Sequence, residues 1–155
     1  MQADVCFSDL IGEVTQELAV CVEAAVSAGL NRARIVVDPG IGFGKTAEQS
    51  AALIGASVWL REAMHCPVMI GASRKSFLET LVADAPATQT RTRSDADPRL
   101  VGSLAAAVVG AHRGASVIRV HDVAQTVQAL AVAGAIGAAW MTFSSRAARA
   151  PGGSR

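Results

Sequence analysis

"IVVDPGIGFGKT", residues 35–46, joins a short apolar run to a glycine-rich loop that ends in Gly-Lys-Thr. A nucleotide-binding P-loop has a glycine five positions before the glycine of that ending. Pro39 stands at that position and Asp38 ends the apolar run, so the stretch does not fit a P-loop. It predicts a buried strand that delivers Asp38 to a ligand, followed by a loop whose glycines let the backbone pass close to a flat ligand.

Two later segments repeat this design of a short apolar run that leads into polar residues. They are "VMIGA" (68–72) and "SVIRVHD" (116–122). The spacing of apolar residues predicts helices around these strands, over residues 9–28, 47–66, 75–83, 99–114 and 123 to about 141. Because helices and strands alternate, we expect an α/β fold in which helices join parallel strands.

The bulk properties of the chain narrow the possible partners. A net charge of +1 gives no reason to expect a nucleic acid or an anionic membrane surface. No uninterrupted apolar run reaches the ~18 residues of a membrane span, and no signal sequence follows Met1. Three widely spaced cysteines, Cys6, Cys21 and Cys66, form no metal-ligand pattern and suit small buried positions in a reducing compartment. We therefore expect a cytoplasmic protein without a metal site in this chain.

Polar side chains follow each of the three predicted strands. Asp38 ends the first, "GASRKS" (71–76) follows the second, and Arg119 and His121 lie on the same face of the third because one residue separates them. The carboxyl ends of parallel strands form the ligand-binding edge of α/β folds. A Lys, an Arg and a His that meet there suggest a diphosphate site, although a solvated basic turn and a structural His121 are the simpler alternatives.

Three motifs resemble a known family. "DPGIGFGKT", "GASRKSF" and "GASVIRVHDV", in this order, closely resemble the last three strand-loop motifs of dihydropteroate synthases, over about residues 1–140. The resemblance implies the C-terminal three βα units of a (β/α)8 TIM barrel, strands six to eight preceded by helix five, which are incomplete on their own. Residues 1–141 would form a partial pterin-binding domain, and residues 142–155 a frayed or disordered tail.

The resemblance also implies an activity. Members of that family join 6-hydroxymethyl-7,8-dihydropterin diphosphate to p-aminobenzoate, which yields 7,8-dihydropteroate and diphosphate in folate synthesis, the step that sulfonamides inhibit. A pterin-dependent methyltransferase is a less favoured alternative, because a methyl donor carries no diphosphate for "SRKS" and "RVHD" to bind. A catalytically inactive remnant and a half-barrel that depends on a partner are further alternatives.

Residue roles follow from the same resemblance. Asp38 would hold the aminopyrimidine edge of the pterin, Lys75 would reach the pterin and help to bind both substrates, and Arg119 would stack on the pterin. Arg119 and His121 would bind the diphosphate, so Lys75, Arg119 and His121 are the predicted catalytic residues. The predicted substrate-binding residues are Asp38, Gly42, Phe43 (beside the p-aminobenzoate entrance), Gly71 (the open pocket floor), Ser73, Arg74, Lys75, Ser76 (at the p-aminobenzoate carboxylate), Arg119 and His121.

The chain departs from the family in its number of strands. A (β/α)8 barrel has eight strands in typically ~250 residues, whereas this sequence predicts three. We therefore expect the first five strands to be absent from this chain, together with the ligand of the Mg²⁺ that the resemblance implies. A complete barrel is expected to form a homodimer, and the activity of the 155 residues alone is expected to be low or absent.

Overall fold

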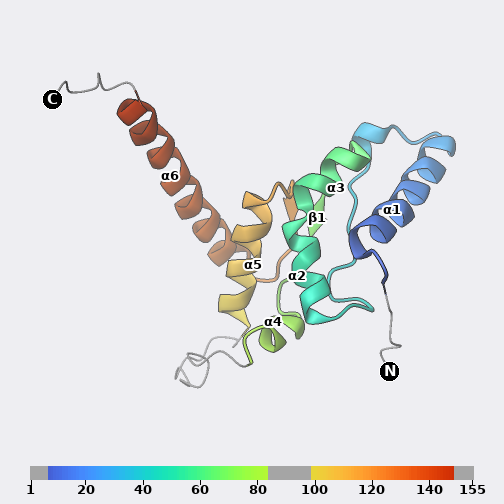
Figure 1. Ribbon diagram of the computed structural model, residues 1–155, viewed down its shortest axis with the longest axis horizontal. Coiled ribbons are helices and arrows are strands. Elements are labelled where there is room, and N and C mark those ends of the chain that lie inside the picture. Colours follow the sequence, from blue (N-terminus) through green and yellow to red (C-terminus); the bar gives the residue numbers. More distant parts are fainter. Residues whose placement is uncertain (1–6, 84–98, 149–155) are drawn as a thin grey trace.

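The computed structural model describes residues 7–83 and 99–148, with side chains as far as Met141. Residues 1–6, which include Cys6, residues 84–98, and residues 149–155 of the predicted tail lie outside the described residues. Figure 1 shows helices arranged around a small central sheet. The elements are α1 (Leu10–Ser27), the 3-10 helix η1 (Arg32–Arg34), α2 (Ala47–Gly55), α3 (Ser57–Met64), β1 (Met69–Ile70), α4 (Phe77–Thr80), α5 (Leu100–His112), β2 (Val117–Ile118) and α6 (Val123–Ala148).

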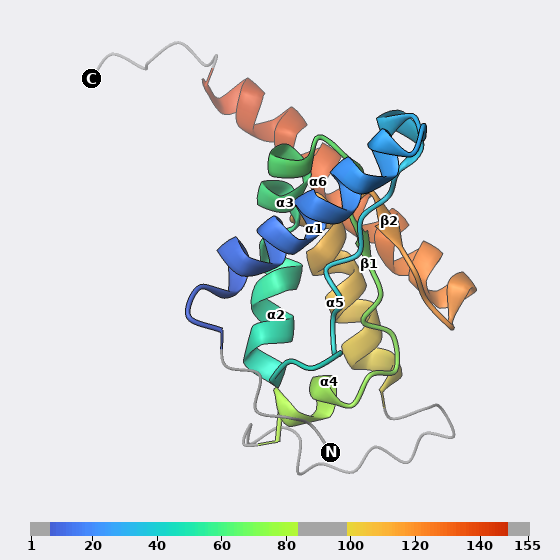
Figure 2. The same ribbon diagram turned by 90° about the vertical axis from the view of Figure 1, so that its right-hand side faces the viewer.

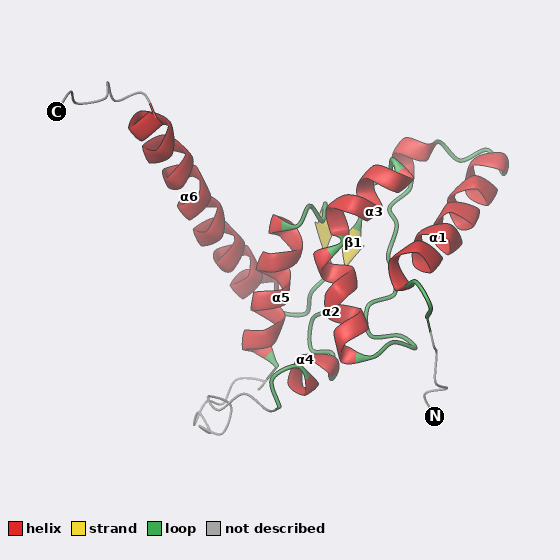
Figure 3. Ribbon diagram, in the orientation of Figure 1, coloured by secondary structure: helices red, strands yellow, loops and turns green. Residues whose placement is uncertain are grey.

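The sheet brings the three predicted strand segments together in parallel. β1 pairs with β2, with Met69 opposite Val117 (Figure 3). On the other side of β1, Val37 forms a parallel bridge with Val68. The predicted strand over residues 34–38 is thus reduced to a single bridge at Val37. The pairing stops there because Pro39 has no N–H to donate and the Asp38 side chain accepts a hydrogen bond from Gly40 in the following loop. The middle segment is the one that ends in Gly71.

Helix boundaries follow local capping signals. The Asp9 carboxylate accepts a hydrogen bond from the Gly12 N–H and starts α1, and Gly29, with φ of +96°, follows its end. Thr46 and Gln49 form a capping box at the start of α2. The helix predicted over 75–83 is shorter, and α5 ends two residues before Gly114.

The single helix predicted over residues 47–66 is wrong. The structure has two helices, α2 and α3, which meet at Ala56. The Ser57 hydroxyl donates a hydrogen bond to the Ile54 carbonyl at 2.7 Å, and a serine that bonds the backbone in this way competes with a regular helix. Gly55 beside it has a low helix propensity, so the break occurs at the weakest point of the predicted helix.

The core lies where α2 and α3 pack against the strands. Its most buried side chains are aliphatic: Ile41, Leu53, Leu60, Val68 and Ile70. Cys66 is buried as expected, but Cys21 is exposed on α1, so the expectation of buried cysteines is wrong at that position. Figure 2 shows that the segments leading into α2 and α4 reach the same end of the molecule, which gathers the loops that follow the strands.

Helix α6 extends away from the rest of the molecule (Figure 1). The helix continues to Ala148, whereas the sequence predicted that it ends near residue 141 and that a frayed tail begins at residue 142. That prediction is wrong for residues 142–148. Its exposed large apolar residues are Val123, Val127, Val132, Ile136, Trp140 and Met141. Although the sequence has no uninterrupted apolar span, Val123–Met141 has the length and composition to cross a membrane. Core helices of soluble proteins meet the same criterion.

Candidate functional site

The candidate site lies where loops follow the three parallel segments. Arg119, after β2, reaches across the middle segment toward Asp38, and its Nη2 atom lies 3.6 Å from Asp38 Oδ2. Asp38 Oδ1 also accepts a hydrogen bond from the Gly40 N–H at 2.9 Å. The Asp38 side chain keeps 29% of its surface exposed and that of Arg119 keeps 57%, so both groups remain open to a ligand.

Gly71 makes the approach of Arg119 possible. A Cβ atom at this position would lie 2.7 Å from Arg119 Nη2 and 3.1 Å from its Cζ atom. The guanidinium therefore lies flat over a backbone position that has no side chain. The sequence predicted an open pocket floor at Gly71, and the group that occupies this space in the structure is Arg119.

Lys75 extends from the loop after β1 to the glycine-rich loop. Its Nζ atom donates a hydrogen bond to the Ile41 carbonyl and lies 4.1 Å from the centre of the Phe43 ring. Burial lowers the pKa of Lys75; Asp38 opposes this shift, and the positive charge of Arg119 adds to it. Gly42, with φ of +74°, provides the space, because a Cβ atom there would lie 2.8 Å from Lys75 Cδ.

A hollow of about 470 Å³ opens beside Lys75. Phe43, which is 65% exposed, stands at its edge, and Ser76 lines it at the start of α4. Lys45 also lines it and donates a hydrogen bond to the Phe43 carbonyl at 3.2 Å. Lys45 was not predicted as a site residue, and its place directly before the capping box of α2 was a signal that could have found it.

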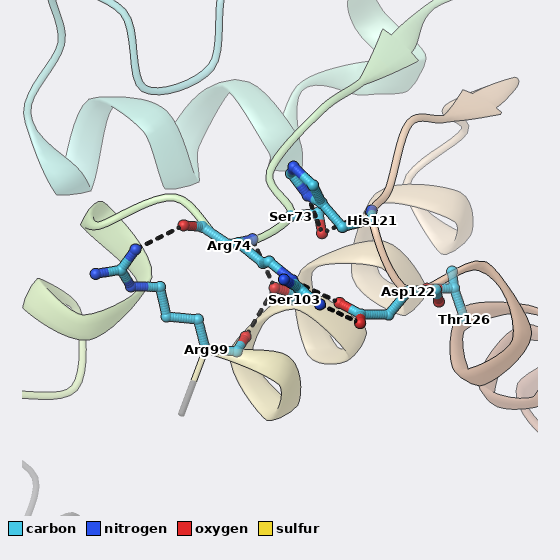
Figure 4. Close-up of polar contacts among 7 residues, drawn as sticks. All are labelled: Ser73, Arg74, Arg99, Ser103, His121, Asp122 and Thr126. Atoms are coloured by element: carbon cyan, nitrogen blue, oxygen red, sulfur yellow. Dashed lines mark hydrogen bonds and ion pairs between the residues drawn. The ribbon is translucent and has the colours of Figure 1, made fainter. Parts of the chain in front are cut away.

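Ser73 and His121 connect the loop after β1 to the loop after β2 (Figure 4). The His121 N–H donates a hydrogen bond to the buried Ser73 hydroxyl at 3.2 Å, and His121 Nδ1 lies 3.1 Å from the same oxygen. One serine thus contacts both the backbone and the ring of His121. The two residues, predicted separately, form one unit.

Arg74 has a protein partner that the sequence analysis missed. Its guanidinium binds Asp122 through two hydrogen bonds, of 3.1 Å from Nε and 2.6 Å from Nη2 (Figure 4). The hydrogen bonds from Arg74 hold the pKa of the Asp122 carboxyl below its usual value. Arg74 stays predicted as a substrate-binding residue, but its guanidinium is directed to Asp122. The only signal in the sequence was the acidic residue directly after His121.

Among the described residues, no three His, Cys, Asp or Glu side chains come close enough to hold a metal ion. Asp38 is the carboxylate nearest to Arg119, and its two oxygens already face Gly40 and Arg119. The described part of the site therefore does not fit a bound Mg²⁺ on its own. It fits an anion and a planar polar ligand, since the positive side chains of Lys75 and Arg119 lie near the Asp38 carboxylate and His121 lies on the same loop as Arg119.

The chain belongs to the family of pterin binding enzymes, whose sequence profile matches residues 1–121. Its curated relatives include dihydropteroate synthases. That of Neisseria meningitidis serogroup B is 37% identical over 139 residues, 88% of this chain and 46% of the relative. That of Escherichia coli K12 is 35% identical over 134 residues, 85% of this chain and 43% of the relative.

Solved structures give the same family. Dihydropteroate synthase from Stenotrophomonas maltophilia, with imidazole bound in its active site, superposes with a TM-score of 0.75 at 35% identity, over 89% of this chain and 48% of that one. The Xanthomonas albilineans enzyme in complex with 7,8-dihydropteroate superposes with a TM-score of 0.74 at 36% identity, over 88% and 49%. The chain thus spans less than half the length of these relatives.

Proposed function

We propose that the chain forms strands six to eight of a (β/α)8 barrel and carries the part of a dihydropteroate synthase site that binds the pterin diphosphate. The observation that carries this proposal is the contact of Arg119 with Asp38, which joins the two outer segments across Gly71 in the middle segment. The reaction would condense 6-hydroxymethyl-7,8-dihydropterin diphosphate with p-aminobenzoate to give 7,8-dihydropteroate and diphosphate.

Asp38 and Arg119 have the chemistry to recognise a pterin. The aminopyrimidine edge offers adjacent N–H donors, and a partly exposed carboxylate accepts two such bonds. The flat guanidinium of Arg119 over Gly71 suits stacking on a planar ring. A ligand that offers only acceptors, such as a carboxylate or a carbonyl oxygen, would not bind to Asp38 in this way. The carboxylate of Asp38 itself offers only acceptors, so it needs donors on the ligand.

The hollow beside Phe43 has the character of a second substrate site. Its volume, about 470 Å³, lies in the ordinary range for small-molecule sites. Lys75 and Ser76 supply a positive charge and a hydroxyl for the carboxylate of p-aminobenzoate, and Phe43 supplies an apolar edge for its ring. We propose that the amine end of p-aminobenzoate points from this hollow toward the pterin.

The reaction needs stabilisation of a leaving group more than it needs a base. The C–O bond between the pterin methylene and the diphosphate breaks, and the bonding electrons leave with the diphosphate. Arg119 and His121 would stabilise this developing charge. The lone pair of the neutral aromatic amine then forms the new C–N bond, and the amine loses a proton. No covalent bond to the protein is required.

Further parts of the proposal concern the complete enzyme. Mg²⁺, which the family resemblance implies, would be bound by residues other than those described, since these bring no suitable ligand set together. We also propose a cytoplasmic location, a homodimer when the barrel is complete, and no membrane or nucleic-acid partner.

A half-barrel that depends on a partner chain is a second candidate. It is favoured by the exposure of Val127, Ile136 and Trp140 on α6, because large apolar side chains along one helix rarely remain in water. In this case the chain would bind pterin diphosphate weakly alone and would turn over substrate only together with the remaining strands.

Titration calorimetry of the 155-residue chain with 6-hydroxymethyl-7,8-dihydropterin diphosphate tests the proposal. We expect micromolar binding, and about a tenfold loss in Asp38→Asn, because the amide offers one acceptor where the carboxylate offers two. Asp9→Asn is the matched control: it makes the same change at the start of α1, where Asn caps as well as Asp. Equal binding by Asp38→Asn and wild type would contradict the assignment of Asp38.

A further inference from the structure

The turn after β1 contains a backbone conformation that needs an explanation. Arg74 has φ of +58°, in the left-handed region that side chains other than glycine rarely adopt. Among the described residues only His65 shares this feature without being glycine, and His65 lies at the end of α3, where such a conformation is common. Arg74 instead lies between two residues of the candidate site, Ser73 and Lys75.

Every polar group of Arg74 is held by another segment (Figure 4). Its N–H donates to the buried Ser103 hydroxyl at 2.8 Å, and its carbonyl accepts from Arg99 Nη1 at 3.1 Å. Its guanidinium binds Asp122. The Ser103 hydroxyl in turn donates to the Arg99 carbonyl at 2.7 Å, so the start of α5 holds the turn from one side and Asp122 holds it from the other.

Asp122 is itself fixed to the start of α6. Its carbonyl accepts hydrogen bonds from the N–H and the hydroxyl of Thr126, at 3.0 and 2.8 Å. Since His121 precedes Asp122 and contacts Ser73, two successive residues of one loop bind two successive residues of the other. These paired contacts set the distance and the orientation between the loop that carries Lys75 and the loop that carries Arg119.

We propose that Arg74 and Asp122 are positioning residues, which hold the loops after β1 and β2 in register so that Lys75, Arg119 and His121 face one bound diphosphate. The charge pattern supports this. Arg74, Lys75 and Arg119 place three positive charges on two adjacent loops, and Asp122 neutralises the charge of Arg74. The diphosphate part of this inference rests on the proposed function.

The variant Arg74→Gly separates positioning from folding. Glycine adopts the left-handed backbone without strain and keeps the N–H and the carbonyl that Ser103 and Arg99 bind, while the link to Asp122 is lost. Asp122→Asn removes the charge and keeps the shape. Glu23→Gln is the matched control, because it removes the carboxylate of another surface pair, Arg32–Glu23, which lies outside the site.

Two measurements test the proposal in the full chain. Amide hydrogen exchange of His121 can be measured without a ligand. We expect exchange to be about tenfold faster than wild type in Arg74→Gly, accelerated by a smaller factor in Asp122→Asn, and unchanged in the control Glu23→Gln. Calorimetry with inorganic diphosphate is expected to show about tenfold weaker binding in Arg74→Gly at an unchanged or raised melting temperature.

Wild-type exchange rates at His121 in both variants would overturn the proposal. Diphosphate affinity within twofold of wild type despite faster exchange would also overturn it, because the pair would then serve the fold alone. A wild-type chain that binds no diphosphate would contradict the proposed function instead, and the exchange rates alone would then decide whether Arg74 and Asp122 hold the two loops together.

Discussion

Replacing Gly71 by Ala should separate ligand binding from stability. The added Cβ atom would lie 2.7 Å from Arg119 Nη2, against 3.4 Å for ordinary contact, so the guanidinium must move by about 0.7 Å or more. The side chain of Arg119 is 57% exposed and free to do so, whereas the backbone at Gly71 is not in the left-handed region and accepts alanine without strain.

The added methyl group should therefore weaken the Asp38–Arg119 contact. That contact is already 3.6 Å long, and a displacement of this size away from Asp38 would break the ion pair. A hydrogen bond from Arg119 to the bound diphosphate would contribute about 1.5–3 kcal/mol, so we expect displacement of Arg119 to weaken the binding of pterin diphosphate about 10- to 100-fold. The free energy of unfolding should stay within about 1 kcal/mol of wild type, since replacing glycine by alanine also restricts the unfolded chain.

The assay combines calorimetry, thermal unfolding and the NMR signal of Arg119 Nε, which reports the contact with Asp38 without a ligand. Gly55→Ala is the control, because a Cβ atom there meets nothing within 4 Å and the position is helical. Binding within twofold of wild type, or an unchanged Nε signal, would refute the reasoning. A large loss of stability would show that the backbone, not Arg119, absorbs the added methyl group.

Three further predictions concern other parts of the structure. Because burial lowers the pKa of Lys75, the unfolded state binds more protons than the folded state at pH values between the lowered pKa and about 10.4. Wild type should therefore gain stability relative to Lys75→Met as the pH rises through that range. Urea unfolding of both proteins at pH 7 and pH 10 tests the sign of this change. Thr46→Ala removes the capping box of α2 and should lower the free energy of unfolding by about 0.5–2 kcal/mol in the same assay, whereas Thr46→Ser should not. In a Trp59→Phe variant, Trp140 is the remaining tryptophan, and because it is 71% exposed its fluorescence emission should be that of an indole in water. The emission should shift to the blue only when a partner covers α6. An emission that is already blue-shifted in the dilute monomer would contradict the exposure of this helix.

Local signals in the sequence were enough for the elements but not for the contacts between them. The spacing of apolar residues marked α1 to within one residue at both ends, and the three apolar runs marked three parallel segments in the observed order. The break at Ala56 was missed, because it depends on the hydroxyl of Ser57, which a pattern of apolar residues does not register. The end of α6 was missed because residues 142–148 lack a regular apolar spacing and still continue the helix.

For the candidate site, the sequence indicated which loops meet but not which side chains pair. Asp38, Lys75 and Arg119 were expected on one edge, and the structure brings them there. Asp122 was overlooked, because it lies 48 residues from Arg74 and only the register of β1 and β2 places them together. Ser103 was overlooked for the same reason: its hydroxyl matters only once α5 packs against the turn.

The crossing of Arg119 over Gly71 to Asp38 has an evolutionary consequence. Residues 38, 71 and 119 are far apart in the sequence but are in contact along one line in the structure. A replacement at any one of them therefore changes which side chains the other two positions can accept. A side chain at position 71 would leave the guanidinium position undisturbed only together with a shorter group at position 119, and the loss of Arg119 would leave the carboxylate at position 38 without its counter-charge. We expect these three positions to covary as a set in related sequences and to show strong epistasis in double-mutant cycles.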